Sequence, residues 1–317
     1  MGQKLTLGEA LAKNAANAEK YVDKFCSEAE KLRAKPTMPP AGASADAAPF
    51  MAGRVDYEKP LDLPHGSLYL PEELRTRLRA ADWISKVTDA DLAGRDFSWM
   101  AALGKFDHWS LLGAGRLRDY ADNDVLHGPI PNYSSLVGWA KLRYALALRQ
   151  GDAAAASLEV RHLADLIRSQ GILIGEMVAI HIYRFDVPAR QAAAAAGQDV
   201  SRWIAPDLDD LQRQRELGFA ALDFGYPGVD AATLRKAMSC AVAPCTALVE
   251  AVAVTKSLRG ASVSDNLDVL NQLASERGCP ADVLSRLNGT HEMATAEALE
   301  VVSDDLPVDL PKRLSAL

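Results

Sequence analysis

The apolar residues between Ser134 and Phe185 recur at helical spacing and predict three consecutive helices. Within 134–150, hydrophobic side chains fall three and four residues apart and charged ones take the remaining positions, which is typical of an amphipathic helix. Residues 153–170 begin with four alanines, which favour a helix and allow close packing, and continue with the same spacing. The segment 172–185 is apolar on nearly every side, so we expect it to form the central helix of the fold.

A Gly-Asp pair separates the first two of these helices. Gly151 can take the left-handed conformation that ends a helix, and Asp152 can accept hydrogen bonds from the first free amides of the next one. So short a connection predicts two antiparallel helices in contact with each other.

The hairpin resembles the tetratricopeptide repeat, whose turn also carries a Gly-Asp pair followed by a small residue. Ala156 occupies the small position, and Trp139 stands one residue from the aromatic position of the first helix. Leu163 stands where a small residue is usual, Arg168 replaces the closing proline, and no second copy follows at a spacing of about 34 residues. The resemblance spans 134–170 and implies a helical-hairpin array that binds a partner protein.

The remainder of the chain also predicts helices, interrupted by one long proline-rich stretch. Residues 4–34 form one amphipathic helix by the same spacing rule. Seven prolines between 36 and 71 exclude a regular helix there, while the apolar residues among them favour an extended belt over the helices. Beyond it we expect further helices, including one from Asp230 to 258 that Pro244 kinks or breaks, and an extended tail from 304 to 317.

These elements predict an all-α protein of about ten helices, arranged as an irregular bundle or a short α-solenoid-like array. Proline and glycine lie between the periodic segments rather than within them, and runs of β-branched residues are few, which also favours helices. We expect four parts along the chain: an N-terminal helix (1–35), a proline-rich linker or belt (36–71), a helical domain (72–303) and a C-terminal tail (304–317).

The net charge of −7 arises from interspersed acidic and basic residues and argues against a nucleic-acid partner. No apolar run reaches the length of about 20 residues that a transmembrane helix needs, and the N-terminus lacks a secretory leader pattern. We therefore favour a cytoplasmic protein. A periplasmic or membrane-tethered protein stays open as an alternative, in case an N-terminal anchor has been removed.

Of the four cysteines, three lie in the C-terminal third of the chain. A disulfide from Cys240 or Cys245 to Cys279 would link two predicted helices in an oxidising compartment, whereas Cys26 stands alone in the sequence. Because no export signal is visible, we favour reduced and buried cysteines. Their spacing lacks the C-x-x-C pattern of zinc sites, so we expect no metal there.

Two acid–histidine pairs in the central helices are the candidates for a polar site. Glu159 and His162 form the E-x-x-H pair that di-iron bundles use, but a second such pair is missing. Glu176 and His181 are five residues apart and point in different directions around a helix. Since catalytic and nucleotide-binding motifs are also absent, we expect no metal and no cofactor. The four residues would supply polar groups if the central helices enclose a ligand pocket.

The most aromatic stretch, 96–113, is suited to core packing or to an interaction surface. Aromatic side chains are more often buried, yet Trp99, Phe106 and Trp109 would also serve as a partner-binding surface. The function we expect is a non-enzymatic helical scaffold or adaptor that binds another protein. The alternatives are an enzyme or small-ligand-binding protein with a pocket at the central helices, and the soluble part of a membrane-tethered protein.

Overall fold

The computed structural model describes most of the chain and confirms the all-α fold class. The described residues are 7–33, 45–56, 65–109, 131–170, 173–201, 203, 206–224, 229–241, 248, 263–277 and 310–315. Within these ranges the ordered backbone is helical, and the chain forms no strand beyond an isolated bridge between Asp46 and His108. In the same ranges, no helix has the length and apolar character that crossing a membrane requires.

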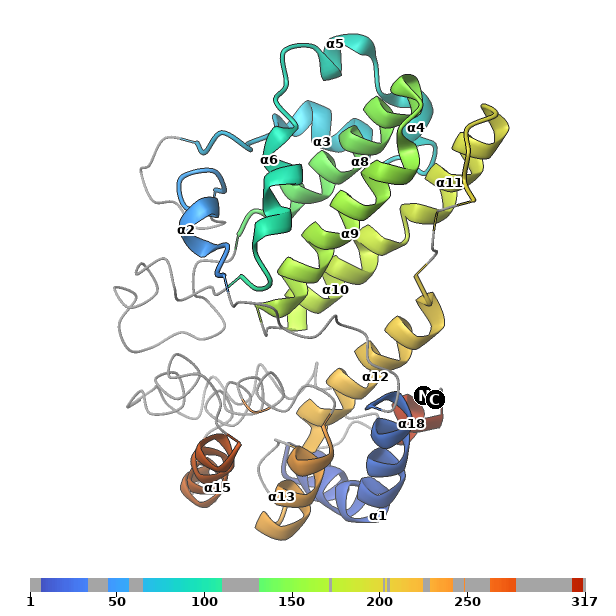
Figure 1. Ribbon diagram of the computed structural model, residues 1–317. Coiled ribbons are helices and arrows are strands. Elements are labelled where there is room, and N and C mark those ends of the chain that lie inside the picture. The colour runs from blue at the N-terminus through green and yellow to red at the C-terminus, as the bar shows by residue number, and fades with distance from the viewer. Residues whose placement is uncertain are drawn as a thin grey trace.

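The helices form two groups that are joined by one long helix (Figure 1). The upper group consists of α2 (Ala48–Met51), α3 (Glu72–Leu78), α4 (Trp83–Lys86), α5 (Asp89–Leu92), α6 (Ser98–Ala102), the 3-10 helix η1 (Leu103–Lys105), α8 (Tyr133–Gln150), α9 (Ala153–Ser169), α10 (Leu173–Tyr183) and α11 (Asp186–Ala195). The lower group consists of α1 (Leu7–Arg33), α13 (Ala231–Cys240), α15 (Val263–Glu276) and α18 (Leu310–Ser315). Helix α12 (Leu208–Phe224) runs from one group to the other.

Each group has its own hydrophobic core. The first core extends from Ala47 to Leu211 and is built mainly on α8, α9 and α10. The second core joins α1 to the C-terminal half of α12 and to α13, α15 and α18. Because Leu211 belongs to the first core and Leu217 to the second, α12 contributes one end to each.

The predicted hairpin of α8 and α9 is confirmed at the centre of the first core. Gly151 ends α8 with a φ of +81°, and its N–H donates to the Ala147 carbonyl at 2.8 Å. The prediction for Asp152 is wrong, because its side chain makes no capping hydrogen bond. The Asp152 carboxylate accepts a hydrogen bond from Arg143 at 3.1 Å instead. It therefore links the two helices and does not cap α9.

Helix α10 is not enclosed on every side, although its sequence is apolar nearly all round. One side packs on α9 and contacts α8 and α12. Along the other side, Ile174 and Met177 are 40% and 43% exposed, and His181 and Arg184 follow on the same line. High hydrophobicity alone does not imply full burial, since much of a protein surface is apolar.

Residues 65–71, at the end of the proline-rich stretch, lie against α8. The Leu68 carbonyl accepts a hydrogen bond from Trp139 Nε1 at 2.8 Å, and the Leu70 N–H donates to Ser135 Oγ at 3.3 Å. A Cβ atom at Gly138 would lie 2.5 Å from the Leu70 Cδ1 atom. Glycine at this position of α8 therefore lets the belt approach the helix closely.

One turn of helix occurs inside this stretch, where the sequence predicted none. Pro49 stands in the first turn of α2, a position at which the missing N–H breaks no helical hydrogen bond. Met51 and Val55 then point into the first core. The prolines exclude a long helix but tolerate a single turn.

The second core confirms the amphipathic helix predicted at the N-terminus. Five apolar residues of α1 are buried at the expected spacing: Ala18, Val22, Phe25, Ala29 and Leu32. Phe25 lies 5.0 Å from Phe224 of α12, measured between ring centroids. The tail does not stay extended, because Leu310–Ser315 forms α18 and buries Leu310 and Leu314 against α1 and α12.

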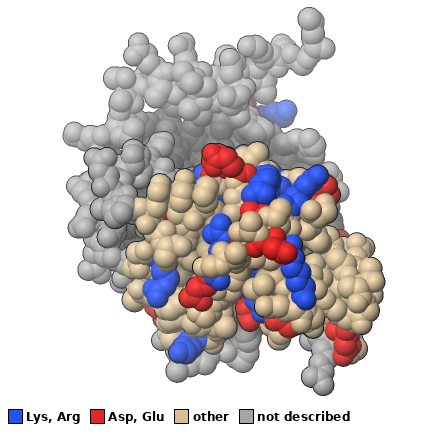
Figure 2. Space-filling model, turned by 90° about the horizontal axis from the view of Figure 1, so that it is seen from above, with Lys and Arg blue, Asp and Glu red and all other residues tan. Residues whose placement is uncertain are grey.

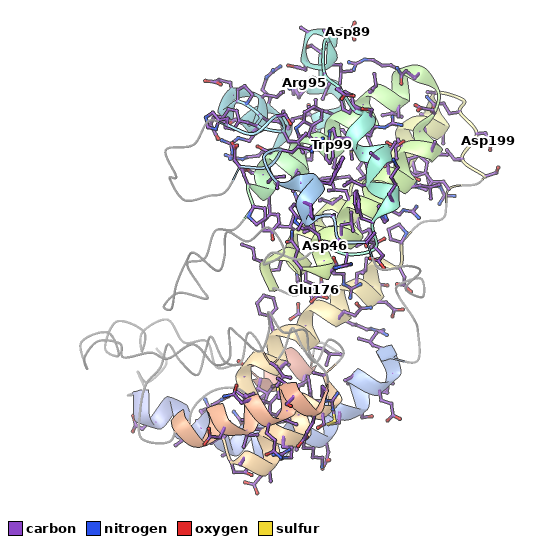
Figure 3. The ribbon with its side chains drawn as sticks, turned by 60° about the vertical axis from the view of Figure 1, so that its left-hand side comes forward. Asp46, Asp89, Arg95, Trp99, Glu176 and Asp199 are labelled. Atoms are coloured by element: carbon purple, nitrogen blue, oxygen red, sulfur yellow. A yellow bond between two sulfur atoms is a disulfide. The ribbon has the colours of Figure 1, made fainter. Side chains whose placement is uncertain are left out.

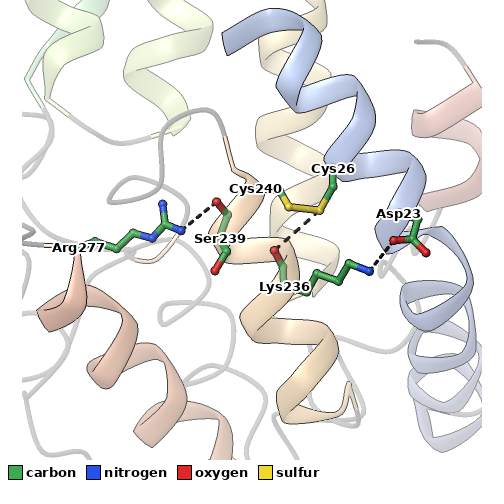
Figure 4. The surroundings of a disulfide bond; sticks show 6 residues. All are labelled: Asp23, Cys26, Lys236, Ser239, Cys240 and Arg277. Atoms are coloured by element: carbon green, nitrogen blue, oxygen red, sulfur yellow. Dashed lines mark hydrogen bonds and ion pairs between the residues drawn. A yellow bond between two sulfur atoms is a disulfide. The ribbon is translucent and has the colours of Figure 1, made fainter. Parts of the chain in front are cut away.

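A disulfide joins α1 to α13, so the favoured prediction of reduced cysteines is wrong, and the pair is neither of the alternatives that the sequence offered. Cys26 bonds Cys240, with 5.0 Å between their Cα atoms and a sequence separation of 214 (Figure 4). Cys245 and Cys279 lie outside the described residues. Spacing in the sequence suggests pairs only between cysteines that are close in the chain and leaves Cys26 alone. It cannot show that Cys26 lies beside a helix more than 200 residues away. Helix α13 ends at Cys240, consistent with the predicted break near Pro244.

Candidate functional site

Polar side chains line a buried seam between α9, α10 and α11. Positions 161, 165 and 168 of α9 share one side of that helix, because residues three and four apart face the same way. Opposite them lie side chains from the next two helices. Along the seam, acidic and basic groups follow one another: Asp186, Arg161, Asp165, Arg168 and Glu176.

Asp186, at the start of α11, is the most heavily bonded member of this seam. Its side chain accepts hydrogen bonds from the Tyr144 hydroxyl, from Arg161 Nε at 2.7 Å and from Trp203 Nε1 at 3.3 Å. Asp186 is only 2% exposed, so its charge depends on these donors for stabilisation. The Tyr144 and Trp203 rings lie parallel, with 5.9 Å between centroids, and complete a rigid cluster that we call the Asp186 cluster.

Burial keeps both tyrosines of the seam in their protonated form. It raises the pKa of the Tyr144 hydroxyl, and the neighbouring Asp186 carboxylate raises it further. The pKa of Tyr183 rises for the same two reasons, with Asp165 as the acidic neighbour that accepts its hydrogen bond. Burial also raises the pKa of Asp165. The tyrosines therefore act as hydrogen-bond donors that hold carboxylates in place.

A pocket of about 380 Å³ opens beside the Asp186 cluster, between α11 and the segment that follows it. We call it the α11 pocket. Its walls combine apolar and polar side chains: Val187, Ala194, Val200 and Trp203 with Asp186, Arg190 and Gln191. Arg190 and Gln191 are exposed, and neither side chain bonds to another residue of the described ranges.

The four polar residues proposed from the sequence do not line the α11 pocket, and the structure does not bring them together. Glu159 pairs with Arg143, whose Nε lies 2.8 Å from Glu159 Oε2. His162 Nε2 lies 2.9 Å from the Leu103 carbonyl oxygen. These contacts hold α9 against α8 and η1.

The second proposed pair is also divided between different neighbours. Glu176 Oε1 lies 3.2 Å from Arg168 Nη2, and burial raises the pKa of this carboxyl although Arg168 partly offsets the effect. His181 lies edge-on to Phe185, and burial, Lys141 and Arg184 lower its pKa. Figure 3 shows Glu176 at the lower edge of the upper group, where α10 faces α12.

The aromatic residues proposed for partner binding belong largely to the first core. Trp99 is 5% exposed and Trp109 is 2% exposed. Trp99 packs edge-on against Trp139 with 5.8 Å between ring centroids, and Phe106 is half-buried against Phe50. The interpretation as an interaction surface is therefore wrong for the two tryptophans, whose area is already used in packing.

Neither a metal site nor a charged patch stands out in the parts that the structure places. Among the described residues, no three His, Cys, Asp or Glu side chains gather as metal ligands would. Seen from above, acidic and basic side chains alternate over the upper group without a broad area of one charge (Figure 2). Among the described residues, the α11 pocket with its buried cluster is therefore the best candidate site.

Sequence reasoning missed this site because its parts come from distant positions. Tyr144, Arg161, Asp186 and Trp203 lie on three helices and a loop, and no spacing rule connects them. The available signal was weak: an arginine among the charged positions of 153–170 and an acid at the end of the apolar run. Comparison of the chain with protein-family models, with curated proteins and with solved structures found no match.

Proposed function

We propose that the protein is a non-enzymatic binding protein that holds a small molecule in the α11 pocket. The observation that carries the proposal is the pairing of a preformed, mainly apolar hollow with two polar side chains, Arg190 and Gln191, that bond to no other side chain or backbone group of the described residues. Small-molecule sites typically have apolar walls and few polar groups that fix orientation. This choice takes the small-ligand alternative from the sequence but moves the pocket away from Glu159, His162, Glu176 and His181.

The rigid base of the pocket supports binding. Asp186 is held by three donors from α8, α9 and the segment after α11, and Trp203 is fixed by its contact with the Tyr144 ring. A wall that does not rearrange loses little entropy when a ligand arrives. The same bonds argue against catalysis, because a carboxylate that is already paired with an arginine is a poor proton acceptor.

The test asks whether a bulky side chain placed in the α11 pocket abolishes the binding of small ligands. A library of small fragments is screened against the wild-type protein by ligand-observed NMR, and the hits are repeated with Ala194→Trp. We expect hits that disappear when this exposed wall residue becomes bulky. Ala195→Trp, one position along α11 and outside the pocket lining, is the matched control and should keep them. Hits that survive Ala194→Trp unchanged would contradict the proposal.

A second candidate function is binding of a partner protein along the exposed side of α10. Ile174 and Met177 are apolar residues one turn apart on this surface. For this function, a purified partner should lose binding to Met177→Glu, while Leu158→Glu should leave it unchanged. Leu158 is a suitable control because it is an exposed leucine on α9, away from that line. Equal loss with both variants would count against an α10 interface.

A further inference from the structure

We infer that the α11 pocket takes a small carboxylate with a flat apolar body. The inference rests on the proposed function and adds the chemical class of the ligand. The first argument concerns charge. Asp186 and Arg190 are the charged residues among the described lining, and Asp186 is already paired with Arg161 Nε at 2.7 Å. Among the described lining residues, the remaining charge is the positive guanidinium of Arg190.

Arg190 is suited to an anion with a planar group. A guanidinium offers parallel N–H donors that match the two oxygens of a carboxylate. Its side chain is exposed and forms no ion pair with another described residue, so a ligand need not break an existing contact. Gln191, the next residue along α11, adds an amide that can donate to or accept from the ligand. The Arg190 charge would repel an amine, and Asp186 would attract it little because that carboxylate is already paired.

The walls determine the other end of the ligand. Val187, Ala194 and Val200 contribute aliphatic surface, and the indole of Trp203 closes the base. Three small or branched aliphatic groups around an aromatic ring favour contact with another flat apolar group. The carboxylate would lie at Arg190 while the apolar body lies over Trp203.

The volume of the α11 pocket limits the size of the ligand's apolar body. About 380 Å³ is near the lower end of the range for ligand pockets, which is roughly 300–1,000 Å³. A single ring with a short acid chain fits this volume better than a nucleotide or a long acyl chain. Since so small a ligand makes few contacts, we expect dissociation constants from about micromolar to about millimolar.

The experiment compares three probes that share one skeleton: 3-phenylpropionate, 3-phenylpropan-1-ol and 3-phenylpropylamine. Their binding to the full-length protein is measured by ligand-observed NMR. We expect the carboxylate to bind about tenfold more tightly than the alcohol, and the amine to bind most weakly. Arg190→Gln should reduce carboxylate binding about tenfold and leave the alcohol unchanged. Arg213→Gln, an exposed arginine of α12 outside the pocket lining, is the control and should change neither.

The outcomes separate the ligand class from the proposed function. Equal binding of all three probes, lost with Ala194→Trp, would overturn the carboxylate preference and leave the α11 pocket as a binding site. Carboxylate binding that persists in both Arg190→Gln and Ala194→Trp would overturn the inference by placing the probe elsewhere. Absence of binding for all three at millimolar concentration would also overturn it, and the fragment screen then decides the proposed function independently.

Discussion

The two hydrophobic cores are assembled from the chain in opposite ways. The first core uses residues between 47 and 211, and its central helices α8, α9 and α10 follow one another directly. The second core joins α1 to helices that begin about 200 residues later, and a disulfide spanning 214 residues connects them. Closing a long loop costs conformational entropy before any contact is made. We therefore expect the second core to depend on its covalent link, and the first core on packing between helices that follow one another in the chain.

The aromatic residues allow the two cores to be observed separately. All five tryptophans of the chain lie in the first core, at positions 83, 99, 109, 139 and 203. Tryptophan fluorescence therefore reports unfolding of the first core, while far-UV circular dichroism reports helices of both. A difference between the two signals would reveal independent unfolding.

Removal of the disulfide should have the largest effect. On the loop-entropy model, a closed loop of this length contributes about 5 kcal/mol to the free energy of unfolding. In Cys26→Ser/Cys240→Ser we expect urea to unfold the second core early, which lowers the dichroism signal while the fluorescence transition stays near its wild-type midpoint. The disulfide also holds α1 against α13 beside the ion pair of Lys236 with Asp23, whose charged atoms are 2.5 Å apart.

The control for this prediction is a reductant. Dithiothreitol should shift the wild-type transition towards that of the double variant and leave the double variant unchanged. If fluorescence and dichroism instead moved together by the same amount, the two cores would form one cooperative unit through α12, and the comparison would be wrong.

Breaking the Asp186 cluster should have the next largest effect, and in the first core. Asp186→Ala leaves the Arg161 guanidinium buried without its acidic partner, which costs about 3–5 kcal/mol for pairs of this kind. We expect the fluorescence transition to move to lower urea concentration. Arg161→Met/Asp186→Leu removes both charges and should cost less than Asp186→Ala alone. A double variant as unstable as the sum of its single variants would show that the two groups do not interact.

Lys141 should make the stability of the first core depend on pH. Its side chain is buried between the Trp83 and Phe185 rings and donates to the Leu78 carbonyl at 2.5 Å. Burial lowers its pKa from 10.5 to about 8. Between these values the unfolded chain holds the proton more tightly than the folded one, so the free energy of unfolding should rise with pH. The full difference corresponds to roughly 3 kcal/mol, reached only near pH 10.5.

The measurement is urea unfolding followed by fluorescence at pH values from 7 to about 9.5. The upper limit avoids the ionisation of unfolded tyrosines, which would lower stability because Tyr144 and Tyr183 have raised pKa values in the fold. Lys141→Met should abolish the rise and should be no less stable than the wild-type protein at pH 7. A rise of equal size in Lys141→Met would assign the pH dependence to other groups.

The difference between the cores also explains what the sequence could predict. The Gly151 turn and the buried face of α1 follow from residues within a few positions of one another. The Cys26 partner, the packing of the C-terminal tail and the Asp186 cluster all depend on which helices meet in space. Hydrophobic periodicity does not specify which helices come into contact, so the second core and the α11 pocket could be recognised only from the structure.

The smallest effect should come from the contact between the belt and α8. In Gly138→Ala, the new Cβ would lie 2.5 Å from Leu70 Cδ1, and the end of the leucine side chain would have to move. Alanine favours a helix by about 1 kcal/mol over glycine, but overpacking costs about 1–3 kcal/mol, so we expect a net loss of about 1 kcal/mol.

Gly104→Ala is the matched control for this substitution, because a Cβ there meets no atom within 4 Å. It should leave stability unchanged or raise it slightly. Both substitutions lie in the first core region, so fluorescence-detected unfolding compares them directly. A loss in Gly138→Ala alone would show that the belt packs on α8 as an integral layer of the first core. Equal stability changes in the two variants would mean that Leu70 moves aside without a cost in free energy. The contact between the belt and α8 would then not contribute to the stability of the first core.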